Sequence, residues 1–227
     1  MVIFVRKGSR RKPGEACGDV ISISNDSRAM MLCDGVSSCP CGARSAREGV
    51  NRILSMYESA KEHLWRMIEK DEASSVAALM VRELRAYFEK CARQEGRPLS
   101  DFGTTLAFAM HDPERGKIFA FTLGDSSIRL QRLHTLDEHL CGGGRGHVLE
   151  ASITDPNAEN CTVVRVLDDR QVEGLLFLSD GAWRSLGGGG RGLTMEEVVA
   201  LLRHYRPQDD AAAGVLTIKR KRVDEDA

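Results

Sequence analysis

Four aspartates at the ends of apolar segments are the feature that most restricts how this chain can fold. They are Asp19, Asp34, Asp180 and Asp209. A carboxylate at the end of a buried strand is costly unless another group compensates its charge. Because the four are spread over the whole chain, one shared compensator is the simplest explanation. Hard divalent cations such as Mg²⁺ and Mn²⁺ prefer oxygen ligands, so the sequence predicts a metal site assembled by folding.

Length and charge predict a single soluble domain. The chain has 227 residues, of which 29% are charged, and its net charge is -1. We expect one domain over residues 1–222 and a charged tail over residues 223–227. The balanced charge gives no reason to expect nucleic acid or an anionic membrane as a partner. No apolar run approaches the ~20 residues of a membrane span.

The cysteines favour reduced thiols and therefore a cytoplasmic location. Their number is odd, seven, and their spacing has no disulfide-like rhythm. Cys39 and Cys41 form a C-x-C pair that invites a zinc hypothesis. No second Cys/His pair at finger-like spacing follows, so structural or incidental thiols are the favoured interpretation.

Hydrophobic periodicity indicates an α+β fold. Apolar residues recur at helical spacing over residues 42–70 and 76–91, and residues 194–205 begin with the capping box Thr194 and Glu197. Short apolar runs predict strands at 2–5, 20–24, 29–33, 104–110, 117–123, 128–133, 162–166, 175–178 and 215–218. Consecutive hairpins with segregated helices are typical of antiparallel sheets.

The aspartates suggest phosphoester chemistry. Two divalent ions ~3.5–4 Å apart can orient and deprotonate a shared water for attack on phosphorus. Gly35 and Gly181 directly follow Asp34 and Asp180. A glycine lets the backbone approach an ion closely, and its carbonyl can serve as a ligand.

Five motifs together resemble those of the metal-dependent type 2C protein Ser/Thr phosphatases, the PPM family. They occur in the family's order and rough spacing, at 34–36, 101–106, 123–130, 178–181 and 209–210. The resemblance covers the chain from about Gly18 to Ile218. It implies an antiparallel β-sandwich flanked by helices, and phosphoserine and phosphothreonine proteins as substrates.

The resemblance also implies a role for each matched residue. Asp34 would bridge two Mg²⁺ or Mn²⁺ ions, with the Gly35 carbonyl as a further ligand. Asp180 and Asp209 would complete the shell of the second ion. These three aspartates are the implied catalytic set. Taken singly, each has an alternative interpretation as a strand-end turn residue or cap.

Two further aspartates have weaker implied roles. Asp19 resembles the acidic residue that acts on the ions largely through water, and Asp125 resembles a carboxylate of a third metal site. Where the family often has another aspartate, four residues after Asp180, this chain has Arg184. Because like charges repel, we expect the third site to be weak or missing. Asp210 is interpreted as solvated or as a local hydrogen-bond acceptor.

Two further groups are needed, one to bind the substrate phosphate and one to protonate the leaving group. A histidine that could protonate the leaving oxygen is absent after Asp34-Gly35. The family often holds the substrate phosphate with an arginine before its first acidic motif, and Arg10 or Arg11 could take that part. A solvated basic loop remains the alternative interpretation of these two residues.

Two other functions remain open from the sequence. A phosphatase fold that has lost catalysis would act as a regulatory binding module, and Arg184 and the absent histidine favour it. The retained aspartates argue against it, since buried carboxylates without metal repel one another. A dinucleotide site at Gly187–Gly192 matches a G-x-G-x-x-G pattern but does not directly follow a strand, so a loop is the better explanation.

Overall fold

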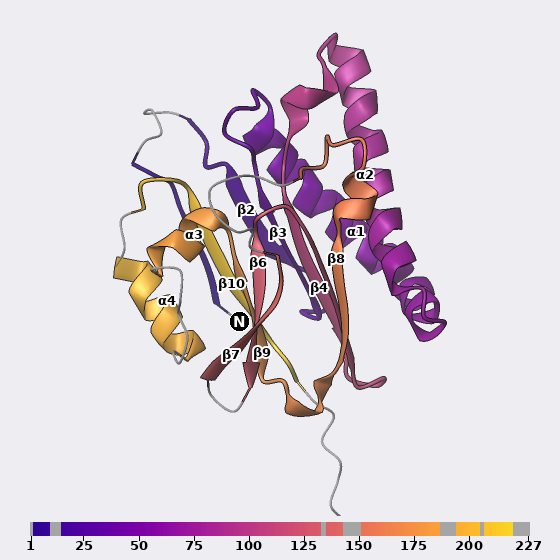
Figure 1. Ribbon diagram of the computed structural model, residues 1–227, viewed down its shortest axis with the longest axis vertical. Coiled ribbons are helices and arrows are strands. Elements are labelled where there is room, and N and C mark those ends of the chain that lie inside the picture. The colour runs from indigo at the N-terminus through magenta and orange to yellow at the C-terminus, as the bar shows by residue number, and fades with distance from the viewer. Residues whose placement is uncertain are drawn as a thin grey trace, which may run out of the picture.

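Two antiparallel sheets lie face to face, with a pair of helices on each outer side (Figure 1). The computed structural model describes residues 2–9, 15–132, 135–142, 151–186, 194–204 and 207–219. The expected α+β class and the antiparallel sandwich are therefore confirmed. No helix within these described residues is both long and apolar enough to cross a membrane.

Each sheet has five strands. The first sheet has the order β1 (Val2–Arg6), β10 (Ala211–Thr217), β9 (Gly174–Leu178), β6 (Ser127–Arg132) and β7 (Thr135–Gly142). The second sheet has the order β2 (Asp19–Ile23), β3 (Ala29–Asp34), β4 (Leu106–Asp112), β5 (Lys117–Leu123) and β8 (Val163–Asp168). All neighbouring strands are antiparallel.

The helices cover the outer faces of the two sheets. The long helices α1 (Gly42–Glu69) and α2 (Ala73–Glu95) pack on the second sheet, and the short helices α3 (Asp180–Ser185) and α4 (Met195–His204) pack on the first. Three 3₁₀ turns complete the described elements, at Leu99–Phe102, Ala158–Cys161 and Asp169–Gln171.

The burial of strand β3 on both faces explains why its sequence is apolar without interruption. Met31 and Cys33 face the long helices, whereas Met30 and Leu32 face the first sheet. Side chains alternate between the faces of a strand, and both faces are buried here. The strand can therefore carry a charged residue only at its end, where Asp34 lies.

The antiparallel register brings distant segments to one end of the sandwich. Asp19, the first residue of β2, lies opposite Asp34 across the β2–β3 pair. Leu178, the last residue of β9, pairs with both Ser127 of β6 and Ala213 of β10. The residues that follow β9, or precede β6 and β10, therefore meet near the end of β3.

Some elements differ from the sequence prediction. Helix α3 was not expected, because six residues are too few to show a helical period. Strand β7, which ends at Gly142, was also missed. Strand β10 begins at Ala211 instead of Val215, since pairing with β1 and β9 overrides the low strand propensity of alanine. The Gly187–Gly192 loop and the 222/223 boundary lie outside the described residues.

Candidate metal centre and active site

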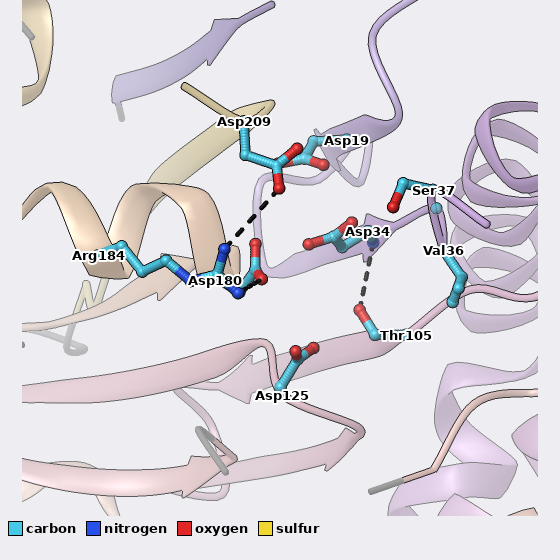
Figure 2. A pocket seen from close by; sticks show the side chains of 10 residues that line it. Asp19, Asp34, Val36, Ser37, Thr105, Asp125, Asp180, Arg184 and Asp209 are labelled. Atoms are coloured by element: carbon cyan, nitrogen blue, oxygen red, sulfur yellow. Dashed lines mark hydrogen bonds and ion pairs between the residues drawn. The ribbon is translucent and has the colours of Figure 1, made fainter. Parts of the chain in front are cut away.

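Five carboxylates from five segments of the chain line one pocket at this end of the sandwich. Figure 2 shows them pointing into a shared space between the two sheets. They belong to Asp19, Asp34, Asp125, Asp180 and Asp209. The structure thus brings together every aspartate that the sequence suggested as a metal ligand.

Each carboxylate is placed by the boundary of an element. Asp34 ends β3, Asp19 begins β2 and Asp180 begins α3. Asp125 lies in the connection between β5 and β6, and Asp209 precedes β10. The chain leaves its strands at these places because the glycines and turn residues after the strands permit sharp changes of direction.

The backbone of Asp34 is fixed by two threonines of the motif at 101–106, Thr104 and Thr105. Its carbonyl accepts hydrogen bonds from Thr105 N at 2.8 Å and from Thr104 Oγ1 at 2.9 Å. Its own N–H donates to Thr105 Oγ1 at 3.3 Å. Thr105 Oγ1 also lies 2.8 Å from Ser126 Oγ, so this threonine connects Asp34 to the segment that carries Asp125.

Close packing requires a glycine at position 35, whether or not its carbonyl is a metal ligand. A Cβ at this position would lie 2.4 Å from the carbonyl oxygen of Gly42, at the start of α1. The Gly35 N–H donates to Gly18 O at 3.0 Å, which fixes the position of the segment before Asp19. The residue lines the pocket, and its carbonyl as a metal ligand remains a prediction.

Burial makes the carboxylates hard to ionise without a cation. It is the main cause that raises the pKa of Asp19 to about 7, with repulsion from Asp210 and Asp180 adding to it. Burial also raises the pKa of Asp34 well above its usual value, helped by the charges of Asp19, Asp180 and Asp125. Ionised carboxylates so placed require positive charge.

The residues present fit a hard divalent ion. Their side-chain donors are oxygens, and Oδ2 of Asp19 is buried without a hydrogen-bond partner in the described part of the chain. An orphaned buried acceptor of this kind requires a further ligand. As placed, the described His, Cys, Asp and Glu side chains do not form a ready group of three at metal-ligand spacing.

Arg184 lies against the carboxylates of the second expected ion. Its Nη2 is 2.5 Å from Asp180 Oδ2, and its Nη1 is 3.8 Å from Asp209 Oδ2 (Figure 2). Burial raises the pKa of Asp180, whereas the charge of Arg184 lowers it. The sequence predicts an effect of this arginine only on the third metal site.

Asp210 has a role that the sequence analysis missed. It is only 2% exposed, and its two carboxylate oxygens accept hydrogen bonds from the N–H groups of Gly8 at 2.8 Å and Gly18 at 2.5 Å. It is therefore neither solvated nor a local acceptor, because these partners are about two hundred residues away in the chain. It holds both ends of the segment that contains Arg10 and Arg11, which lie outside the described residues.

The zinc hypothesis gains no support from the described cysteines. Cys39 and Cys41 are free thiols. Asp101, quoted within the family motifs, lies in the 3₁₀ turn after α2 and pairs with Arg97 at 3.2 Å. It takes no part in the pocket lining described above.

Comparisons with known proteins agree with this architecture. The family model for protein phosphatase 2C matches residues 7–212. No curated protein matches the sequence. A bacterial serine phosphatase superposes with a TM-score of 0.71 at 15% identity, covering 98% of each chain.

Two further solved structures have the same fold. The serine/threonine phosphatase Stp1 from Staphylococcus aureus has a TM-score of 0.64 at 15% identity, over 96% of this chain and 94% of that one. The catalytic domain of the phosphatase PstP, solved with two manganese ions, has a TM-score of 0.62 at 16% identity, over 95% and 97% of the two chains. At such identities, these likenesses show the fold.

Proposed function

The chain belongs to the protein phosphatase 2C family, and on that premise we propose that it hydrolyses phosphoserine and phosphothreonine in proteins, using Mg²⁺ or Mn²⁺. The observation that carries this proposal is the convergence of five carboxylates on one pocket. A pocket of this charge would repel a phosphate dianion. Bound cations would reverse that repulsion.

We assign the ion-holding roles to the residues at the centre of the pocket. Asp34 would contribute to both ions, and Asp180 and Asp209 to the second. The Gly35 carbonyl would be a further ligand, and Asp19 would act largely through water. When bound, divalent ions supply positive charge for phosphate oxygens and lower the pKa of a water molecule. The manganese-bound PstP structure supports the choice of two ions.

The remaining assignments concern the periphery of the pocket. Asp125 would hold a weak third ion, if this site forms. Arg10 or Arg11 would bind the substrate phosphate, since a guanidinium matches the geometry of phosphate oxygens. The support for this assignment is that Asp210 holds Gly8 and Gly18, which flank the basic segment, close to Asp209. The proposed location is the cytoplasm.

Phosphate release from a phosphothreonine peptide, with and without Mn²⁺, tests the proposal. We expect release by the wild-type protein only with Mn²⁺. Asp34→Asn and Asp180→Asn should lower kcat at least about a hundredfold, because charge stabilisation of this kind contributes factors of 10²–10³. Far-UV circular dichroism checks that the variants are folded. Near-wild-type turnover in both variants would refute the site assignment.

A regulatory binding module is the second candidate, and the ion pair between Arg184 and Asp180 favours it. A cation that already neutralises a ligand carboxylate leaves less charge for metal. In this case the wild-type protein would bind phosphopeptide but release no phosphate at any Mn²⁺ concentration. Arg97→Gln is the matched control, because it removes an ion pair of the same i,i+4 spacing outside the pocket. It should behave as the wild-type protein does, both in phosphate release and in phosphopeptide binding.

A further inference from the structure

One positive side chain stands among the carboxylates of the described pocket lining. Arg184 reaches Asp180 at 2.5 Å and Asp209 at 3.8 Å with two different nitrogens of its guanidinium. These are the two carboxylates assigned above to the second ion. No ion pair of Arg184 with Asp19, Asp34 or Asp125 is found among the described residues. The arginine therefore neutralises the side of the pocket formed by Asp180 and Asp209.

The helix geometry holds the arginine at this place. Asp180 and Arg184 are four residues apart on α3, the spacing at which side chains meet on a helix surface. Asp180 lies in the first turn and Arg184 in the last, which suits the helix dipole. The pairing with Asp209 comes from the start of β10 packing beside α3, since a Cβ on Gly181 would lie 1.9 Å from Asp210 O.

The ion pairs of Arg184 with Asp180 and Asp209 can open to solvent. The Arg184 side chain is 40% exposed and that of Asp209 is 41% exposed. Exposed ion pairs are weak because water competes for both partners. A long flexible side chain at the mouth of the pocket can thus move outward without breaking the packing of α3.

We propose that Arg184 is a built-in competitor of the second divalent ion: it occupies the Asp180–Asp209 pair, and an ion gains these ligands only by displacing it. The inference rests on the proposed metal site. It predicts two unequal binding steps, with an undisturbed first step at Asp34 and a weakened second step. Activity would then respond to the metal concentration that fills the second site.

Isothermal titration of metal-free protein with Mn²⁺ tests this inference directly. In Arg184→Gln we expect the second step to be about tenfold tighter, on the order that one charge within a few ångströms of a divalent ion produces. Arg184→Lys keeps the charge, so this variant should bind Mn²⁺ nearly as the wild-type protein does. Arg97→Gln, the control pair outside the pocket, should leave both steps unchanged.

Thermal unfolding provides a second readout that does not depend on activity. Without metal, Arg184→Gln should melt below the wild-type protein, because it loses the ion pairs that offset carboxylate repulsion. With saturating Mn²⁺ the order should reverse. If the glutamine variant does not fold, Arg184→Met, which keeps the aliphatic stem, takes its place in both measurements.

The outcomes separate this inference from the proposed function. Equal Mn²⁺ binding by wild type and Arg184→Gln would overturn the inference, and metal-dependent phosphate release would then still support the function. Binding of one ion by wild type and two by the glutamine variant would support the inference. Absence of Mn²⁺ binding in every variant would overturn both.

Discussion

Two buried aspartates of nearly equal exposure illustrate how partners decide the role of a residue. Asp210 is 2% exposed and uses both oxygens to accept backbone N–H groups. Asp19 is 3% exposed, and its Oδ2 has no partner among the described residues. A satisfied carboxylate fixes structure, whereas an orphaned one is available to a ligand. Burial alone would not distinguish these two residues.

The metal-free protein should lose stability as pH rises from about 4 to about 7. The pKa of Asp19 is about 7 in the folded state, against 3.8 as its ordinary value. In this window the folded state binds more protons than the unfolded chain. For each extra proton that it binds, the free energy of unfolding falls by up to ~1.4 kcal/mol for every unit by which the pH rises. The raised pKa values of Asp34 and Asp180 act in the same direction.

Urea unfolding in EDTA across this pH range measures the effect. Asp19→Asn should flatten the dependence, because an amide does not titrate. Excess Mn²⁺ should reverse the sign, since metal binds the ionised carboxylates and releases protons. Stability that is constant or rising with pH in the metal-free wild-type protein would contradict the charge assignment.

At the scale of elements, the site depends on close contact between α3 and the start of β10. Ser179 N donates to Ala212 O at 3.0 Å, and Ala212 N donates to Ser179 Oγ at 3.0 Å. Gly181, on the first turn of α3, has no room for a side chain beside Asp210 O. These contacts set the separation between Asp180 and Asp209, so the spacing of these two carboxylates is a property of how two elements pack.

Gly181→Ala should therefore destabilise the protein, although alanine is the better helix former. Overpacking typically costs about 1–3 kcal/mol. A Cβ only 1.9 Å from the backbone oxygen of Asp210 belongs at the upper end of that range, above the gain of about 1 kcal/mol in helix propensity. Gly49→Ala in α1 is the matched control, because its new Cβ would meet side-chain atoms and no backbone, with the Cys33 sulfur at 3.0 Å and Leu84 Cδ2 at 3.5 Å. Urea unfolding of both variants checks this order, and a Gly181→Ala variant as stable as the wild-type protein would refute it.

At the scale of the whole molecule, the sequence predicts the parts with a clear period. The long helices and most strands follow from apolar spacing, and the five aspartates follow from their places at segment ends and from the family motifs. The position of Arg184 beside Asp209 could not be predicted, because it depends on the packing of α3 against β10. The long-range bonds of Asp210 were missed for the same reason: contacts between distant segments leave no periodic signal.

The four-layer architecture explains why one end of the sandwich holds the site (Figure 1). The inner strands β3, β4, β9 and β10 are buried on both faces, by the other sheet and by helices. The carboxylates of the pocket therefore lie where these strands begin or end. The rigid sheets fix these ends relative to one another, which suits a centre built from side chains far apart in the sequence.

Anomalous diffraction from crystals grown with Mn²⁺ tests the central claim most directly. We expect manganese density in contact with Asp34, and with Asp180 and Asp209 once Arg184 has moved away. Crystals of Asp34→Asn, grown under the same conditions, should lose this density. Manganese bound only elsewhere on the wild-type protein, or not bound at all, would contradict the assignment of these carboxylates as a metal centre.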